Sequence, residues 1–337
     1  MRIPTVLAAP ALMLATFSAA SADEAGSVSY PGGKGPGAGK KIVLISGDEE
    51  YRSEDSMPMF AKILSQRHGF QCTVLFSTGA DGKIDPNAGA SLGNPEALDS
   101  ADAIVMLVRF RKWPDEAMKH FDAAIKRGVP VVGLRTATHS FQFPKGSTYE
   151  AYNTFGKRVL GEQWVSHWGK HKSEATRGVI EAANAKNPVL NGVSDVFGDS
   201  DVYEAAPPAD ATILLRGQVL KGMNPTDEPA DYSKKRSNGT EQKINDPMIP
   251  VAWTREVKND AGKTNHILCT TMGAGTDLRN EGLRRLVVNG VFWGLGLKVP
   301  DKADVTPVGS YEPLPYGFNG FKKDVTPASH ALTPAAH

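Results

Sequence analysis

Short apolar runs in the first half of the chain constrain its fold more than any other feature. They lie within residues 42–45, 102–108 and 129–134. None shows the alternation of apolar and polar side chains that marks a strand with one face in water. Such runs are typical of strands that are buried on both faces, as in a parallel sheet. The sequence therefore predicts a parallel sheet in this half.

Segments with helical spacing separate these strand-like runs. Residues 57–64 and 117–125 repeat apolar side chains every three or four positions. Strands that alternate with helices are typical of a doubly wound sheet with helices on both faces. We therefore predict an α/β fold with a doubly wound, mostly parallel sheet. In such a sheet the ligand crevice lies beyond the carboxyl ends of the strands.

The first polar segment that this rule selects is residues 48–52, directly after the first strand. Asp48 and Glu49 can accept hydrogen bonds from sugar hydroxyl groups, and the ring of Tyr51 can pack against the apolar face of a sugar. Arg52 adds a cation. The alternative is a solvated helix entry, where the helix dipole favours acidic residues.

Two arginines and a histidine follow the other predicted strands. Arg109 and Arg135 can stabilise an anion or an oxygen atom that gains negative charge. Alternatively, they form ion pairs with the acidic residues of the first loop. His139 can move a proton at neutral pH, or it merely hydrogen-bonds its loop. Thr136, in the same turn, is a further candidate for substrate binding.

His167 and His171 are four positions apart and would share one face of a helix. They could bind a metal ion or flank a substrate. Gly169 between them weakens the helix assignment, and the sequence identifies no third metal ligand. We therefore expect a polar wall of the substrate site without a bound cofactor, with a divalent metal as the alternative.

A second acidic cluster and a glycine-rich loop lie in the second half of the chain. Asp201 and Glu204 could divide acid and base work, or they could order the loop around Tyr203. The loop at 271–276 has neither the lysine of a P-loop nor the spacing of a dinucleotide fingerprint. We expect its backbone at Gly273 to approach a ligand closely.

The ends of the chain differ in composition from the central domain at residues 41–299. Residues 1–22 combine an apolar stretch with small residues, which is typical of a cleaved signal peptide, with an uncleaved anchor as the alternative. Residues 23–40 have the composition of a flexible glycine–proline linker. Residues 300–337 form a proline-rich tail whose aromatic residues could dock on the domain. We expect an exported protein, periplasmic or extracellular.

Composition argues against some classes of partner. The 38 lysines and arginines nearly balance the 37 acidic residues, for a net charge of +1, so no basic field supports nucleic-acid binding. No stretch after the signal is long and apolar enough for stable membrane insertion.

Cys72 and Cys269 lie in strand-like runs, which favours buried thiols over a disulfide. A homo-oligomer remains open.

Several short motifs occur in a fixed order along the chain. They occupy residues 133–139, 201–204, 251–255, 270–273 and 289–296. Together they resemble the signatures of the ThuA-like, trehalose-utilisation family. The resemblance spans residues 41–297. It implies a flavodoxin-like sheet related to the class I glutamine amidotransferases.

The resemblance also implies what the site lacks and what it binds. In class I amidotransferases a cysteine sits at a sharp turn between a strand and a helix, and Arg135 fills that position here. An arginine has no deprotonated form that could act as a nucleophile, so we do not expect a glutamine amidotransferase. ThuA-like proteins are linked to trehalose and related disaccharides through their 3-keto derivatives, which implies a small carbohydrate as the ligand.

Two kinds of function fit these observations. In the first, the protein is an isomerase or lyase that acts on a keto-sugar or glycoside, with Arg135, His139, Asp48 and Glu49 as its catalytic candidates. The predicted substrate-binding residues are Tyr51, Arg52, Arg109, Thr136, His167, His171, Glu204 and Gly273. In the second, the protein is a non-catalytic domain that binds carbohydrate or docks on a partner.

Overall fold

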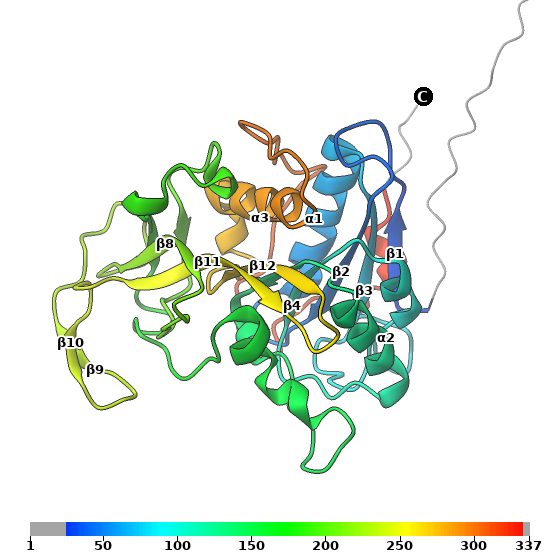
Figure 1. Ribbon diagram of the computed structural model, residues 1–337, viewed down its shortest axis with the longest axis horizontal. Helices are drawn as coiled ribbons and strands as arrows, with labels where there is room; N and C mark the ends of the chain where they lie inside the picture. Colours follow the sequence, from blue (N-terminus) through cyan, green and yellow to red (C-terminus); the bar gives the residue numbers. More distant parts are fainter. Residues whose placement is uncertain (1–24, 333–337) are drawn as a thin grey trace, which may run out of the picture.

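A ten-stranded sheet runs through the computed structural model, which describes residues 25–332 (Figure 1). Its strands lie in the order β1-β3-β2-β4-β5-β12-β11-β8-β6-β7. Their bounds are β1 Ser27–Tyr30, β2 Lys41–Gly47, β3 Gln71–Phe76, β4 Ala103–Val108, β5 Val131–Leu134, β6 Thr176–Ile180, β7 Phe197–Gly198, β8 Thr212–Val219, β11 Ile249–Lys258 and β12 Thr264–Thr270. A separate hairpin consists of β9 (Ser233–Lys235) and β10 (Glu241–Lys243).

The sheet has a parallel centre and antiparallel flanks. Neighbouring strands pair in parallel from β3 through β2, β4 and β5 to β12. The pairs from β12 to β7, and the pair of β1 with β3, are antiparallel. The prediction of a mostly parallel sheet therefore holds for the centre alone. Residues 259–263, which join β11 to β12, are too few for a parallel crossover.

Within residues 25–332, three α-helices cover the two faces of the sheet. Their bounds are α1 Ser53–His68, α2 Asp115–Lys126 and α3 Glu281–Gly294. From β2 the chain passes through α1 to β3 on one side, and from β4 it passes through α2 to β5 on the other. Right-handed crossovers in opposite directions place the two helices on opposite faces. Figure 1 shows α1 and α3 on one side of the sheet and α2 on the other.

The crossovers that leave β2 and β4 run in opposite directions across the sheet, so the sheet has a switch point between these two parallel strands. At such a point the loops after neighbouring strands diverge, and a crevice forms at the carboxyl ends. Short helical turns complete the fold: η1 Pro95–Ser100, η2 Arg135–His139, η3 Glu150–Thr154, η4 Gly156–Leu160, η5 Ala182–Asn184, η6 Pro188–Leu190, η7 Asp277–Arg279 and η8 Pro327–His330. Of these, η2 directly follows β5 at the crevice.

The segment predicted to be a flexible linker is built into the domain. Within it, β1 pairs with the edge strand β3. The amide of Gly33 donates to the carbonyl oxygen of Gly69 at 3.0 Å, and that of Gly37 donates to His68 at 2.8 Å. A side chain at Gly37 would collide with the ring of Phe70. The linker prediction is therefore wrong from residue 25 onward, because glycine here serves close backbone packing against the end of α1.

The proline-rich tail also packs on the domain. The hydroxyl group of Tyr30 donates to the carbonyl oxygen of His330 at 2.8 Å, and that of Tyr311 donates to Gly275 at 2.7 Å. The tail therefore reaches both the β1 edge and the loop after β12. Docking of its aromatic residues, expected from the sequence, is present in the structure.

Both cysteines are buried free thiols, Cys72 in β3 and Cys269 in β12. Burial raises the pKa of each thiol far above its ordinary range, so neither is a ready nucleophile. Among residues 25–332 no helix has the length and apolarity needed to cross a membrane. The predicted signal peptide at residues 1–22 lies outside the described part of the chain.

Candidate functional site

The loops that follow β2, β4 and β5 meet at the carboxyl edge of the sheet. The amide of Arg109 donates to the carbonyl oxygen of Gly47 at 3.0 Å, and that of Phe110 donates to His139 at 3.0 Å. The hydroxyl group of Thr136 donates to the carboxylate of Asp48. The three polar segments selected from the sequence therefore form one continuous surface.

Arg135 lies at the centre of this region, fully buried, with its backbone in the left-handed region at φ 42°. Its Nη1 atom donates to the carbonyl oxygens of Asp201 and Thr271 at 2.7 and 2.9 Å, and Nη2 donates to Asp201 Oδ1 at 3.0 Å. The guanidinium carbon lies 4.6 Å from the ring centre of Tyr51 and 3.8 Å from that of Tyr203. Because these donors serve protein groups, Arg135 acts on a ligand only through its neighbours.

The carboxylate of Asp201 contacts Arg135 and two histidines. Besides the guanidinium, His167 Nδ1 lies 2.8 Å from Oδ2 and His171 Nδ1 lies 3.0 Å from Oδ1. Burial alone would raise the pKa of Asp201, but Arg135 and the hydrogen bonds from both histidines outweigh burial and hold that pKa well below its ordinary range. Asp201 is thus a permanent buried anion at neutral pH.

His167 and His171 come together without a helix. The segment at His167 forms an antiparallel bridge with Tyr203, and the amides of Trp168 and Gly169 both donate to the carbonyl oxygen of Val202. The chain then turns and brings the two imidazole ring centres to 4.6 Å. The helical explanation considered from the sequence is therefore wrong, although the two rings are close.

The two histidines are the most exposed members of the cluster around Asp201. Their side chains are 34% exposed for His167 and 28% for His171, whereas the carboxylate of Asp201 is fully buried. A ligand that enters the crevice therefore meets the imidazole rings first.

Acidic residues of the loop after β2 face the histidines from the opposite side. Glu50 Oε1 lies 3.2 Å from His171 Nε2, and Glu50 Oε2 lies 3.7 Å from Arg109 Nη1. Glu49 bridges Arg109 and Arg111, each at 2.8 Å. The predicted alternative of an ion pair between Arg109 and Glu49 is present. Charged groups thus form an unbroken chain from Asp201 to Arg111.

The carboxylate of Glu49 has an unusual electrostatic environment for a partly exposed group. Burial, followed by the nearby charge of Asp48, raises its pKa, although Arg111 and Arg109 act in the opposite direction. Its side chain is 18% exposed. Glu49 therefore combines access to the crevice with a proton affinity above that of a free glutamate.

Asp48, by contrast, shapes the loop. Its Oδ1 atom accepts hydrogen bonds from the amides of Glu50 and Tyr51 at 2.7 and 2.6 Å, and Oδ2 accepts one from Thr136. The whole residue is buried. These contacts occupy both oxygens, so Asp48 and Thr136 position the acidic loop and are not placed to contact a substrate.

His139 is buried between aromatic rings. Its ring centre lies 4.9 Å from that of Phe110 and 5.1 Å from that of Trp164. Burial, followed by the positive charges of Arg109 and Arg135, lowers the pKa of His139 well below its ordinary value. The imidazole is therefore neutral at pH 7 and a weak base, which makes it a poor choice for the catalytic proton acceptor.

The tail contributes Tyr316 to the crevice. Its ring stacks on Tyr51, with ring centres 5.3 Å apart, and lies 5.7 Å from the ring of His171. The buried guanidinium of Arg52 donates to the carbonyl oxygens of Pro315 and Gly317 and fixes this segment. Arg52, predicted to bind substrate, therefore holds the tail instead.

Phe318 lies next to Tyr316 at the mouth of the crevice. Its side chain is 55% exposed, and its ring centre is 5.0 Å from the guanidinium carbon of Arg109. The amide of Gly317 donates to the carbonyl oxygen of Glu50 at 2.8 Å. An exposed aromatic face is thus held beside the charged groups of Glu49 and Arg109.

Glu204 and Gly273 have structural contacts that explain their presence. Glu204 accepts hydrogen bonds from Ser166 Oγ at 2.9 Å and from the amide and hydroxyl groups of Ser237. Glu204 therefore orders a loop, which was the alternative to acid–base work. Gly273 has φ 125°, and a side chain there would meet Leu134 at 3.0 Å. The close approach at Gly273 is therefore to the protein core.

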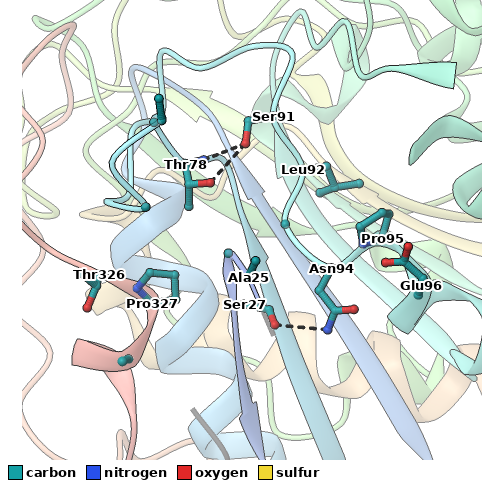
Figure 2. A pocket seen from close by; sticks show the side chains of 16 residues that line it. Ala25, Ser27, Thr78, Ser91, Leu92, Asn94, Pro95, Glu96, Thr326 and Pro327 are labelled. Atoms are coloured by element: carbon teal, nitrogen blue, oxygen red, sulfur yellow. Dashed lines mark hydrogen bonds between the residues drawn. The ribbon is translucent and has the colours of Figure 1, made fainter. Parts of the chain in front are cut away.

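A hollow of about 1010 Å³ lies elsewhere, beside the start of β1 and the end of β3 (Figure 2). Within it Thr78 and Ser91 are hydrogen-bonded, and Asn94 donates to Ser27. Among the described residues that line it, Glu96 alone is charged. The hollow shares no residue with the histidine–carboxylate cluster and brings no such groups together, so its size alone does not indicate a functional site.

Glu50 and Tyr316 belong to the cluster but were not among the sequence-based candidates, and Asp201 was considered only as the acid–base partner of Glu204. The signal for Glu50 is its place in the first loop at the carboxyl edge, and Asp201 lies in an acidic cluster visible in the sequence. Tyr316 has no comparable signal, because the composition of the tail does not reveal where it packs.

Fold and site together define a class: an α/β protein with a histidine–carboxylate cluster at the switch point of a mixed sheet. The family model for ThuA, described as trehalose utilisation, matches residues 41–294, and the chain belongs to this family. The resemblance seen in the sequence is thereby confirmed.

Solved structures of ThuA-like proteins are similar to this chain. One from Parabacteroides merdae is 15% identical, with a TM-score of 0.49, and the match covers 80% of this chain and 96% of that one. Another, from Bacteroides uniformis, is 16% identical, with a TM-score of 0.48, and the match covers 79% and 95%. No curated protein matches the chain.

Proposed function

We propose that this ThuA-family protein acts on a keto-sugar or a related glycoside by moving a proton next to a carbonyl group. One observation carries the proposal: at the switch point, the carboxylate of Glu49, the guanidinium of Arg109 and the exposed ring of Phe318 are neighbours. These are a base, a cation and an apolar platform, which is the set that a keto-sugar needs.

Binding rests on the side chains that reach solvent. The ring of Phe318 offers a face for the C–H side of a sugar ring. His167 and His171 can hydrogen-bond its hydroxyl groups, and both are partly exposed. The link of the family name to trehalose utilisation supports a carbohydrate as the ligand.

Chemistry rests on Glu49 and Arg109. Glu49 takes the proton from the carbon next to the carbonyl, and Arg109 donates a hydrogen bond to the carbonyl oxygen as negative charge develops there. Return of the proton to a neighbouring atom completes an isomerisation. In an elimination the bond to the glycosidic oxygen breaks instead, a C=C bond forms, and the leaving oxygen takes the proton from Glu49 and departs as an alcohol. Of the bases proposed from the sequence, Glu49 is favoured because its side chain is partly exposed, whereas Asp48 and His139 are buried.

A second candidate is a carbohydrate-binding domain without catalysis. It is favoured by the ion pairs of Glu49, whose two oxygens are both engaged, one by Arg109 and one by Arg111 at 2.8 Å. A carboxylate held in this way can orient a hydroxyl group without accepting a proton from carbon. Arg135 at the turn after β5 supports either candidate over a glutamine amidotransferase.

Export of the protein and its relationship to flavodoxin-like folds are further parts of the proposal. The composition of residues 1–22 supports export, which amino-terminal sequencing of the mature protein would test. The order of the parallel strands, β3-β2-β4-β5-β12, supports the flavodoxin-like and amidotransferase-like relationship.

The test is incubation with a panel of 3-keto-disaccharides and their parent sugars, followed by NMR for products and calorimetry for binding. Glu49→Gln should abolish product formation while sugar still binds. Glu116→Gln is the matched control, because Glu116 is an exposed glutamate on α2 that pairs with Lys119. Binding without product by the wild type would favour the second candidate. Neither binding nor product across the panel would refute a carbohydrate function.

A further inference from the structure

The imidazole and carboxylate groups beside the crevice have the composition of a metal centre. His167, His171 and Asp201 each offer one ligand atom, and these atoms lie within 4.8 Å of one another. The Nδ1 atoms of the histidines lie 2.8 and 3.0 Å from the carboxylate oxygens. Two imidazoles and one carboxylate with an open position are the ligand set of many catalytic metal sites.

We propose that His167, His171 and Asp201 bind one divalent transition-metal ion, of which Zn²⁺ is the simplest probe. Nitrogen ligands favour such an ion over Mg²⁺ or Ca²⁺, which prefer oxygen alone. This assignment supplies the third ligand that the sequence did not reveal. It also explains why two histidines from one turn converge on a buried carboxylate.

Outer contacts of the three side chains match those of known metal sites. His171 Nε2 lies 3.2 Å from Glu50 Oε1, and a metal-bound histidine commonly donates its second ring N–H to a carboxylate. With Nε2–H directed at Glu50, Nδ1 of His171 would be the atom that binds the ion beside Asp201. Arg135 fixes the Asp201 carboxylate from behind at 3.0 Å. Lys234 Nζ donates to the carbonyl oxygen of His167 at 2.8 Å and fixes the backbone of that ligand.

The carboxylates and guanidinium groups that form ion pairs around the cluster are equal in number. Three carboxylates face three guanidinium groups: Asp201, Glu50 and Glu49 against Arg135, Arg109 and Arg111. A divalent ion adds two positive charges, so the open position should favour an oxygen-rich or anionic ligand. A hydroxy-ketone that chelates the ion would suit it, and this last step rests on the proposed sugar function.

The rival explanation is a hydrogen-bonded cluster without metal. Asp201 can accept hydrogen bonds from both histidines and from Arg135, and this arrangement satisfies both oxygens of its carboxylate. The two explanations differ in one property that needs no sugar to measure. A metal site loses its affinity for the ion when either imidazole is removed, whereas a hydrogen-bonded cluster has no such affinity.

The experiment uses the full chain, purified without a histidine tag and stripped with a chelator. Equilibrium dialysis with Zn²⁺, read by elemental mass spectrometry, should give one ion per chain. Affinity should fall at least tenfold in His167→Gln and in His171→Gln, and about 10- to 100-fold in Glu50→Gln, which alters only an outer contact. The absorption spectrum of bound Co²⁺ should disappear in the two histidine variants.

His266→Gln is the matched control, because His266 is similarly exposed and lies 3.8 Å from the carboxylate of Glu256. It should bind Zn²⁺ as the wild type does. Absence of stoichiometric binding, or equal affinity in the wild type and both site variants, would overturn the metal site. Binding of Zn²⁺ by a protein that converts no keto-sugar would keep the metal site and refute only the proposed reaction.

Discussion

Replacing Arg135 with methionine tests how the centre of the site is stabilised. Methionine keeps much of the volume of the side chain but removes the charge and all of its donors. The carboxylate of Asp201 would stay buried and would keep only the hydrogen bonds from His167 and His171. The substitution therefore isolates the contribution of the buried guanidinium.

The expected loss can be estimated from the contacts of the guanidinium. It makes hydrogen bonds at 2.7, 2.9 and 3.0 Å, and each bond that involves a charged group contributes about 1.5–3 kcal/mol. Stacking between two tyrosine rings adds roughly 0.5–2 kcal/mol. The cost of dehydrating Arg135 offsets part of this sum. Breaking one side of a buried ion pair typically costs about 3–5 kcal/mol, which we expect for Arg135→Met.

The loss should depend on pH because the pKa of Asp201 is depressed in the folded protein. A depressed pKa contributes stability above the unfolded-state value of about 3.9, and that stability is lost as the pH falls through the folded value. Without Arg135 the folded pKa of Asp201 rises, so the deficit of the variant should be largest at pH 7 and smaller at about pH 3, below the unfolded-state value.

Urea unfolding of both proteins at pH 7 and at about pH 3, followed by tryptophan fluorescence, measures this difference. The double variant Arg135→Met with Asp201→Asn should recover part of the loss, because no buried charge is left unpaired. Wild-type stability in Arg135→Met, or an equal deficit at both pH values, would refute the assigned role of the ion pair.

Three further predictions concern other parts of the molecule. Deleting residues 301–337 should lower the melting temperature in a thermal scan, because Arg52 loses its carbonyl partners; an unchanged value would mean that the tail does not stabilise the domain. Burial, followed by Asp55, raises the pKa of Glu54 to about 8, so its stability contribution is lost as pH rises from about 4.5 to 8. Glu54→Gln should therefore exceed the wild type in urea unfolding at pH 8 and match it near pH 5. Cys72 and Cys269 should react with a thiol reagent only after unfolding; rapid labelling of the native protein would contradict their burial.

The centre of the fold was predictable because its signals are local. Strands β2 and β4 are buried on both faces, and their continuous apolar runs indicate this in the sequence. The rule for carboxyl ends then places Glu49, Arg109 and His139 near one another without any knowledge of tertiary contacts. The antiparallel half gave weaker signals, since strands such as β8 mix buried and exposed positions.

What could not be predicted depends on contacts between distant segments. Gly37 and Gly33 resemble linker residues in composition, yet they pack on the end of α1 because a glycine fits where a side chain would collide. Asp201 lies 30 positions from His171, so spacing could not identify it as a partner. Tyr316 is held at the site because Arg52 donates to the carbonyl oxygens of Pro315 and Gly317. Every residue has a backbone carbonyl group, so the sequence does not reveal this contact.

The ion pair and the proposed metal centre share Asp201, and this connects the two tests. A guanidinium and a divalent ion on one carboxylate repel each other by several kcal/mol at an effective dielectric constant of about 20. Loss of an outer contact weakens metal binding by only about 10- to 100-fold, or about 1.4–2.8 kcal/mol. Repulsion is the larger effect, so Arg135→Met should bind Zn²⁺ more tightly than the wild type does. Saturating Zn²⁺ should therefore raise the melting temperature of the variant more than that of the wild type. An equal rise in both proteins would show that Arg135 and the ion do not compete for Asp201.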